Sequence, residues 1–343
     1  MNVFSLAFGI GTRDSAGNWL EVYYPLPLLS PSEDIIKAIS GPCDYSGGNQ
    51  SIMLDQDQLN QILDNFAGRQ QQQLIDLLSS LLLSKKPLVL CILEKDLTPE
   101  SVPEVYLKLH LLSHRLVEPH GVNLDGMFGL LPNVAWTSAG AIALSDLPQR
   151  QLEARLAGRA LSIDSVDKFP KMTDYVVPSG VRIADTARVR LGAYIGEGTT
   201  IMHEGFVNFN AGSKGEAMIE GRITAGVFVG KGSDLGGGCS ILGTLSGGNK
   251  TVISVGEQCL IGANAGLGIS LGDKCTIEAG LFLTAGTKVS VLDADNKPVE
   301  VVKARDLSGK DELLFRRNST TGVVECLTNR NSIELNAELH AHN

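Results

Sequence analysis

Two residues in the middle of the chain, Glu220 and Arg222, carry side chains suited to acid–base or covalent chemistry. They follow an interruption in a repeating pattern, so we predict that they lie where a loop rejoins a regular element. A carboxylate in such a place can act as a general base or as a nucleophile. The planar guanidinium group of an arginine suits a ligand carboxylate. A solvated loop glutamate and a surface salt bridge are the simpler alternatives.

Basic residues near the C-terminus form a second set of candidates. A ligand rich in phosphate requires point charge and bidentate donors, and these side chains supply both. Four acidic residues are interleaved between positions 300 and 312, so ordinary charge balance is the alternative. The candidates are Lys303, Arg316, Arg317, Asn318 and Ser319.

Other catalytic and metal-binding motifs are weak. His110 and His114 are four positions apart but lack the glutamate of the HExxH pattern. Gly9 and Gly11 have no third glycine at the dinucleotide-binding spacing, and no nucleophile elbow or Walker loop is present. The six cysteines are scattered without a Cys-x-x-Cys pair, and we expect them to be small buried hydrophobic residues.

The region around Glu220 and Arg222 contains aliphatic residues that recur every six positions, and this spacing predicts the regular element that positions the two side chains. A six-residue period indicates a parallel β-helix in which three hexads close one triangular coil. The aliphatic side chains then stack inside the column at about 1.5–3 kcal/mol gross each, and a glycine after many of them permits a tight corner. The set is Ile183, Val189, Ile195, Ile201, Val207, Ile223, Val229, Leu235, Ile241, Val255, Ile261, Leu267, Leu271, Ile277, Leu283 and Val289.

Two interruptions of this period, around Ser213 to Glu216 and at the segment LSGGNKT (245–251), are expected to be loops that leave the column. A short slip separates Leu267 from Leu271. Beyond Val289 we predict a hairpin with its turn at Asp293 to Asn296, and then further strands that cap the end of the column.

The first half of the chain has a mixed α/β pattern. Alternating segments on either side of DSAGN predict two strands, and the apolar run PLVLCILE predicts a buried strand. Apolar residues at helical spacing predict helices over residues 59–83 and 99–116. The sequence thus predicts a mainly β protein with an α/β domain at 1–175, a β-helix at 176–290 and a small β cap at 291–343.

Composition limits the classes of partner. The 343 residues carry a formal net charge of -9, which argues against a nucleic-acid partner. The first residues lack a signal-peptide pattern, and the longest apolar run, LIDLLSSLLLS, is too short to span a bilayer. We therefore expect a cytoplasmic protein without a membrane partner.

Long motifs in the repeat region closely resemble the tetrahydrodipicolinate N-succinyltransferase family, in its longer subtype found in actinobacteria and pseudomonads. The resemblance covers about half the chain, while residues 1–175 add only a compatible length and pattern. The motifs are MHEGFVNFNAG (202–212), EGRITAGVFVGKGSDLGGG (220–238), GTLSGGN (243–249), GANAGLGISLGD (262–273) and LLFRRNS (313–319).

The resemblance implies a left-handed β-helix and a homotrimer with active sites between neighbouring subunits. It also implies transfer of a succinyl group from succinyl-CoA to the amine of ring-opened tetrahydrodipicolinate. The products would be N-succinyl-2-amino-6-oxopimelate and CoA, in the succinylase branch of diaminopimelate and lysine biosynthesis.

Carried over residue by residue, the resemblance makes Glu220 the catalytic carboxylate. Formation of an acyl-anhydride and general-base catalysis both fit this residue. The resemblance also assigns contacts with succinyl-CoA to Arg222, Gly237, Ser240, Ala263, Glu278, Ala279, Gly286, Lys303, Arg316, Arg317, Asn318 and Ser319.

Some family members hold a magnesium ion on the trimer axis, and the resemblance places one ligand at Glu204. The second ligand position is Ala187 in this chain, with Asp185 the nearest acid, so the sequence departs from the pattern. His203 is the only histidine of the repeat region, which excludes a three-histidine zinc site built from this region of one chain.

Two further hypotheses keep the fold. In one, the enzyme uses acetyl-CoA, or acts on another acceptor such as a nucleotide sugar. In the other, the β-helix is a scaffold without catalytic activity.

Overall fold

The computed structural model describes residues 2–66, 71–243 and 252–328. These residues fall into two compact units. The N-terminal unit comprises those within Met1–Leu116 and Gly121–Pro170, and the C-terminal unit those within Val117–His120 and Lys171–Asn343. The boundaries near residues 175 and 290 stay predictions of the sequence.

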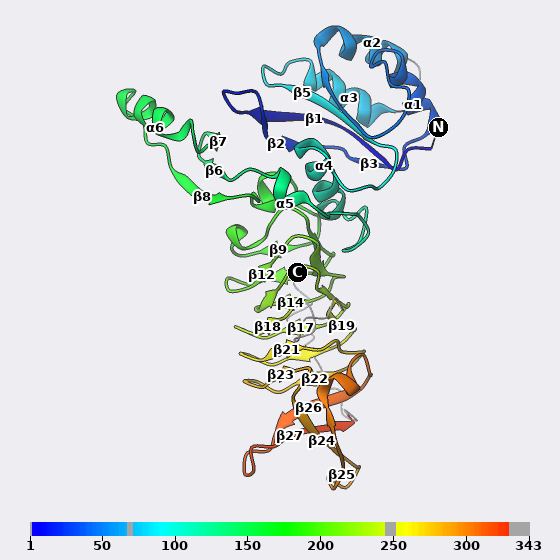
Figure 1. Cartoon of the computed structure of the whole chain (residues 1–343), viewed down its shortest axis with the longest axis vertical. Coiled ribbons are helices and arrows are strands. Elements are labelled where there is room, and N and C mark those ends of the chain that lie inside the picture. The colour runs from blue at the N-terminus through cyan, green and yellow to red at the C-terminus, as the bar shows by residue number, and fades with distance from the viewer. Residues whose placement is uncertain (1, 67–70, 244–251, 329–343) are drawn as a thin grey trace. The chain divides into compact units, whose positions relative to one another are not determined.

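The N-terminal unit is built on an antiparallel sheet with the strand order β2-β1-β5-β4, with β3 paired to β1. All six residues of β5 are buried, which requires cover on both faces of the sheet. The helices α1, α2 and α3 share a core with the sheet, and α4 packs against β2 and β5 (Figure 1). The elements are β1 (Ser5–Arg13), β2 (Trp19–Tyr23), β3 (Leu28–Leu29), α1 (Glu33–Ser40), β4 (Gln50–Leu54), α2 (Gln56–Phe66), α3 (Gln72–Leu81), β5 (Leu88–Leu93) and α4 (Val102–Ser113).

The predicted strands around DSAGN and at PLVLCILE are confirmed as β1, β2 and β5, and the second predicted helix is confirmed as α4. Residues 59–83 contribute to two helices, α2 and α3, and residues 67–70 between them lie outside the described residues. The remainder of the unit comprises α5 (Met127–Leu130), a three-stranded sheet and the helix α6, which has no buried residue. Its elements are β6 (Val134–Thr137), β7 (Gly140–Ala143), α6 (Leu147–Leu156) and β8 (Ile163–Asp167).

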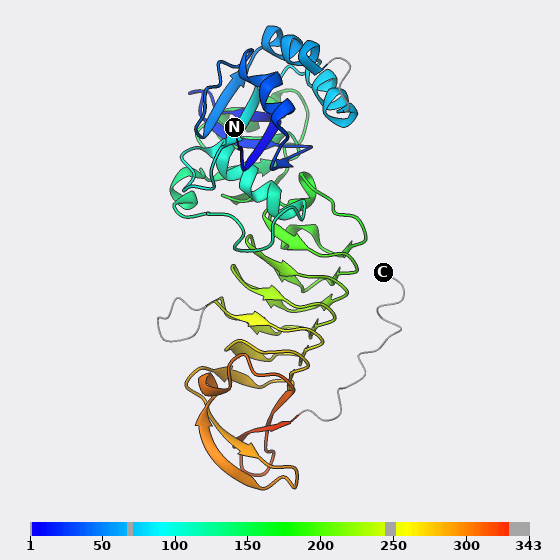
Figure 2. The ribbon, with the colours of Figure 1, turned by 90° about the vertical axis from the view of Figure 1, so that its right-hand side faces the viewer.

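The C-terminal unit contains the predicted prism, a column of triangular coils whose three faces are parallel sheets (Figures 1 and 2). The first face holds β10 (Ala193–Ile195), β13 (Ala211–Ser213), β16 (Phe228–Val229) and β19 (Ser254–Val255). The second holds β12 (Phe206–Val207), β15 (Arg222–Ile223), β18 (Ser240–Ile241), β21 (Gly266–Gly268) and β23 (Phe282–Thr284). The third holds β9 (Arg182–Ile183), β11 (Thr200–Ile201), β14 (Met218–Ile219), β17 (Asp234–Leu235), β20 (Leu260–Ile261) and β22 (Thr276–Ile277).

The six-step aliphatic residues form the interior of the prism, as predicted. Most pair with an equivalent residue on the next coil, for example Ile201 with Ile219 and Ile223 with Ile241, whereas Val289 pairs with Val302 and Val324 of the C-terminal strands. All are buried except Ile183, which is partly exposed because it lies on the first strand of its sheet. The main stabilisation of the prism therefore comes from this stack of apolar side chains.

The first interruption of the period is not a loop, and that prediction was wrong. Ser213 lies inside the prism, 1% exposed, in register with Ile195 and Val229. Its hydroxyl oxygen accepts a hydrogen bond from Gly215 N at 3.2 Å, so the polar group is satisfied inside the column. The period instead shortens to four between Ile219 and Ile223, at the corner that carries Glu220.

The slip between Leu267 and Leu271 is a second four-residue step, since both side chains are buried in the prism. The segment LSGGNKT, together with most of the motif GTLSGGN, lies outside the described residues.

The predicted C-terminal strands are present, and they extend the sheet of the third face. The hairpin is confirmed, with a turn at Asp293 to Asn296 between two antiparallel strands. Phe315 pairs with Ile277 and is fully buried, so it continues the interior column. The strands are β24 (Lys288–Leu292), β25 (Pro298–Lys303), β26 (Leu313–Arg317) and β27 (Val324–Thr328), and short 3-10 turns occupy Met172–Asp174, Thr186–Arg188 and Ala304–Leu307.

Candidate active site

Most of the predicted site residues lie along one edge of the prism, the row of corners between its third and second faces. We call this row the Glu220 edge. Each corner follows an inward residue of the third face, from Ile201 through Ile219, Leu235 and Ile261 to Ile277. The row brings together Glu204, Glu220, Gly237, Ala263, Glu278 and Ala279, with Arg222 and Ser240 at the start of the adjoining strands. Arg316 follows Phe315 inside β26 and is therefore not at a corner.

At the short corner of Glu220, Gly221 lies against the next coil. A Cβ atom at Gly221 would lie 2.2 Å from the Sγ atom of Cys239, which real Cβ atoms do not tolerate. Cys239 is 1% exposed and fills the space directly beside this glycine. Close stacking at this point fixes the backbone on both sides of Glu220.

Glu220 is half-buried, and its carboxylate lies over a glycine of the next coil. Its backbone N–H donates to Leu235 O at 2.8 Å. A Cβ atom at Gly237 would lie only 3.4 Å from Glu220 Oε2, so the absent side chain leaves room beside the carboxylate. The carboxylate therefore lies beside the backbone of a glycine, with no side chain of residue 237 against it.

Cys239 is excluded as a nucleophile by its environment. Burial, and then the negative charge of Glu220, raise the pKa of the Cys239 thiol to about 12. A thiol with this pKa stays protonated near neutral pH, and a protonated thiol is a poor nucleophile. Glu220 is thus the better placed of the two groups for chemistry at this corner.

Arg222 is exposed on the second face, in register with Ser240 of the next coil. Its Nη1 donates to Ser240 Oγ at 3.4 Å, a long contact that uses one of the five N–H groups of a guanidinium. Within the part of the chain that the structure describes, Arg222 forms no ion pair. The salt-bridge alternative for this residue is therefore not supported.

Small residues make the next corners of the edge nearly flat. A Cβ atom at Gly236 would lie 2.7 Å from Ala263 N, and one at Gly262 would lie 2.4 Å from Ala279 N. Successive coils therefore stack backbone on backbone, and Ala263 and Ala279 are the exposed residues of this wall.

The C-terminal candidates are partly engaged with one another. Arg316 Nε donates to Glu325 Oε2 at 2.9 Å, and Asn318 Nδ2 donates to Glu325 Oε1 at 2.8 Å. These bonds to Asn318 and Arg316 lower the pKa of the Glu325 carboxyl, which therefore stays ionised at neutral pH. Arg317 N donates to Glu278 Oε2 at 2.6 Å, so this candidate pair also meets directly. Charge balance thus accounts for part of the basic run.

Four other candidates are exposed: Arg317, Ser319, Lys303 and Gly286. Of these, Lys303 and Gly286 lie off the Glu220 edge. Gly286 lies in the turn after β23, and Lys303 ends β25. Lys303 faces Lys288 across the hairpin, and like charges directly opposite each other are destabilising. Sequence reasoning missed Lys288, which only the strand register of the hairpin connects with Lys303.

The residues of the chain do not fit the two-carboxylate magnesium site of the resemblance. Glu204 is exposed on the Glu220 edge, but Ala187 has no ligand atom in its side chain. The nearest acid, Asp185, accepts a hydrogen bond from Ala187 N at 3.0 Å and caps the following turn. Among residues 2–66, 71–243 and 252–328, no cluster of three or more histidine, cysteine or acidic side chains could hold a metal ion.

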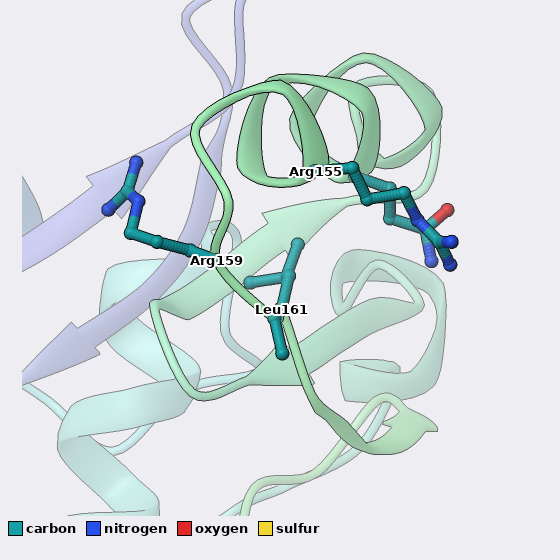
Figure 3. Close-up of a pocket in the computed structure, with 5 residues that line it drawn as sticks. Arg155, Arg159 and Leu161 are labelled. Atoms are coloured by element: carbon teal, nitrogen blue, oxygen red, sulfur yellow. The ribbon is translucent and has the colours of Figure 1, made fainter.

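A separate hollow of the N-terminal unit, about 330 Å³ in volume, contains none of the predicted site residues. Its lining is Gln151, Arg155, Arg159, Ala160 and Leu161, and the two guanidinium groups point away from each other (Figure 3). This lining offers no carboxylate, thiol or hydroxyl group that could serve as nucleophile or general base.

Three family models match the chain. They describe the N-terminal part of tetrahydrodipicolinate N-succinyltransferase (residues 59–129), its middle part (131–171) and the hexapeptide repeat of succinyl-transferase (252–285). A Pseudomonas paraeruginosa protein named 2,3,4,5-tetrahydropyridine-2,6-dicarboxylate N-succinyltransferase is 65% identical over 100% of this chain and 99% of its own length. A Vibrio cholerae protein of the same name is 57% identical over the whole of both chains.

The chain belongs to the tetrahydrodipicolinate N-succinyltransferase family. The crystal structure of a Campylobacter jejuni protein, described as a 2,3,4,5-tetrahydropyridine-2-carboxylate N-succinyltransferase, agrees with a TM-score of 0.89 at 34% identity. It covers 96% of this chain and 93% of that one, and with the repeat model it shows a left-handed parallel β-helix.

Family membership extends beyond the repeat region. Residues 59–171, for which the sequence showed only a compatible α/β pattern, match two models specific to this family. The protein is therefore an acyltransferase by family, and the scaffold hypothesis is not supported.

Proposed function

We propose that this chain transfers a succinyl group from succinyl-CoA to the amine of ring-opened tetrahydrodipicolinate, giving N-succinyl-2-amino-6-oxopimelate and CoA. The observation that carries the proposal is the corner where the Glu220 carboxylate lies over Gly237, with Arg222 at the start of the next strand. The family, whose named members are N-succinyltransferases, supports succinyl-CoA as the co-substrate.

Two mechanisms fit this corner. In the first, Glu220 takes a proton from the amine while the nitrogen attacks the thioester carbonyl, so that a C–N bond forms and the C–S bond breaks. The departing thiolate then receives the proton. In the second, the Glu220 carboxylate attacks the carbonyl and CoA thiolate leaves, which gives an acyl-anhydride. The amine then attacks the succinyl carbonyl of the anhydride, the C–O bond to Glu220 breaks to restore its carboxylate, and the amine proton passes to the CoA thiolate.

The position of the carboxylate beside Gly237 supports either mechanism, because a glycine adds no side chain next to it. We propose that Arg222 binds the distal carboxylate of the succinyl group, for which a planar fork of N–H donors is well suited. An acetyl donor lacks this carboxylate, so Arg222 would select succinyl-CoA.

We propose that the rest of the donor follows the Glu220 edge. Gly237, Ser240, Ala263 and Ala279 form a wall of small residues along which the pantetheine arm can approach backbone amides. Arg317 and Ser319 supply exposed donors for its phosphates, and Arg316 and Asn318 are held through Glu325. Lys303 lies off the edge and supplies a further donor only if the nucleotide end of CoA extends beyond it. Glu278 positions the backbone of Arg317, and Gly286 lies in the turn near the C-terminal strands.

We further propose a homotrimer with active sites between subunits, and a cytoplasmic location. All six cysteines are free and buried, which is the usual pattern in reducing compartments. No helix in the part of the chain that the structure describes is long and apolar enough to cross a membrane. Sedimentation of the purified protein would test the trimer.

Purified protein should be assayed for thiol release with succinyl-CoA and tetrahydrodipicolinate. We expect release with succinyl-CoA and much slower release with acetyl-CoA. Equal rates with both donors would favour the acetyl-CoA alternative, and no release with either would defeat the proposal.

The two mechanisms differ in what accumulates without an acceptor. A covalent anhydride predicts that succinyl-CoA alone adds one succinyl group to the protein at Glu220, detectable by mass spectrometry after rapid acid quenching. General-base catalysis predicts no labelled Glu220.

A further inference from the structure

The outward side of the second face carries a row of residues that continues beyond Arg222. Strand register places Arg222, Ser240, Gly266 and Phe282 at equivalent positions on four successive coils. Their neighbours in sequence, such as Ile223 and Leu283, point into the prism and are buried. The row therefore presents a guanidinium, a hydroxyl and a phenyl ring in that order, and the buried glycine lies between the last two.

Phe282 is 53% exposed, although it is a large apolar side chain on a face that also carries polar groups. Its ring lies over Gly266: a Cβ atom there would meet ring atom Cδ2 at 2.1 Å. Any larger residue at position 266 would displace the ring. The ring is thus held flat against the prism with one side open, which suits contact with an apolar group of a ligand.

The spacing of this row matches the donor proposed above. Adjacent strands lie about 4.8 Å apart, and the Phe282 ring extends from its own coil over that of Gly266, so it lies about 10–14 Å from the Arg222 coil. In a CoA thioester, roughly ten bonds separate the sulfur from the carbon that carries the two methyl groups of the pantoyl unit, about 12 Å when extended. With the thioester at Glu220, these methyl groups reach the coil of Phe282.

We propose that Phe282 binds the gem-dimethyl group of the pantetheine arm of the acyl donor. This inference rests on the proposed function and adds a positioning contact to it. The two methyl groups are the branched apolar part of an otherwise amide-rich arm, so an open aromatic ring is the complementary surface. Phe282 contributes to donor binding and takes no part in the chemical step.

The test uses three donors of decreasing length: succinyl-CoA, succinyl-pantetheine and the succinyl thioester of N-acetylcysteamine, which lacks the gem-dimethyl group. We expect Phe282→Ala to lower kcat/KM by about tenfold with the two longer donors, mainly through KM, and to leave the shortest unchanged. Phe282→Leu, which keeps an apolar side chain, should restore most of the loss.

Three results would overturn this role. An equal loss with all three donors would mean a defect in folding or in assembly of the site. A loss restricted to succinyl-CoA would place the contact at the nucleotide, and no loss with any donor would exclude a contact. Wild-type protein that releases no thiol from succinyl-CoA would instead defeat the proposed function itself.

Discussion

At the scale of single residues, the proposed site depends on one carboxylate and one guanidinium on the same coil. Glu220 is held by its backbone bond to Leu235 and by the close stacking of Gly221 on Cys239. Substitutions that keep the size of the side chain should therefore separate chemistry from folding.

Glu220→Gln should lower kcat by about 10²–10⁴-fold, because the amide can neither accept the amine proton nor attack the thioester. Steady-state thiol release measures the effect. The thermal unfolding midpoint should stay close to that of the wild type, since the amide fits the same half-buried space. A variant with near-normal turnover would remove Glu220 from the mechanism.

Arg222→Lys should lower kcat/KM for succinyl-CoA by about 10- to 100-fold, because loss of charge-assisted hydrogen bonds costs ~1.5–3 kcal/mol. A lysine keeps the charge but loses the planar fork. The slow rate with acetyl-CoA serves as the internal control and should not change. If kcat/KM falls equally with succinyl-CoA and acetyl-CoA, Arg222 does not bind the distal carboxylate of the succinyl group.

At the scale of elements, the prism could be predicted because its inward residues are nearly all aliphatic and evenly spaced. The place where the six-residue period changes could not be predicted, because Ser213 occupies an inward position, where its hydroxyl oxygen accepts a hydrogen bond. Because serine is not aliphatic, a search for aliphatic residues at six-residue spacing identifies Ser213 as an interruption of the period. The true irregularity is the four-residue step at Glu220.

The candidate site was predictable to a similar degree. A resemblance of motifs identified the residues, and the register of the coils explains why Glu220, Gly237, Ala263 and Glu278 share an edge. The engagement of Arg316 and Asn318 by Glu325 depends on the pairing of β26 with β27, which no local pattern of charges indicates.

The stacking of Gly221 on Cys239 predicts a coupled pair. Gly221→Ala alone should destabilise the protein by about 1–3 kcal/mol, because the new methyl group overlaps the sulfur. Cys239→Ala removes the sulfur but not the backbone oxygen of Cys239, 2.8 Å from the new Cβ, so the double variant should be more stable than the sum of the two single changes but less stable than the wild type. Denaturant unfolding of all four proteins measures this coupling. Simple additivity would show that the two residues are not in contact.

At the scale of the whole molecule, the two compact units differ in their buried ionisable groups. His110 lies wholly inside the N-terminal unit, where Tyr24 N donates to its Nε2 at 3.2 Å. Burial lowers the pKa of His110 to about 3, so the neutral imidazole is strongly favoured in the folded state.

This histidine should make the N-terminal unit sensitive to mild acid. An unfolded histidine has a pKa near 6.5, so below that pH the unfolded chain binds a proton that the folded chain excludes. The free energy of unfolding should therefore be independent of His110 above pH 6.5 and fall by about 2 kcal/mol between pH 6.5 and 5. Hydrogen exchange of α4 against pH measures the slope.

The control is His110→Gln, which stays neutral across this range. It should lower the free energy of unfolding at pH 7 but reduce the slope between pH 6.5 and 5. An unchanged slope in this variant would assign the acid sensitivity to other groups.

The strand pairing at the C-terminal end of the prism, between β22 and β26, has a consequence for synthesis on the ribosome. Neighbouring coils pair residues that are only 16 to 26 positions apart, as in Ile261 with Ile277 and Leu235 with Ile261. Each coil can therefore pack on the previous one soon after it emerges from the ribosome. The partner of Ile277 is Phe315, 38 positions later, supplied by a returning strand. The growing end of the solenoid thus stays an open apolar template until nearly the whole chain has been translated.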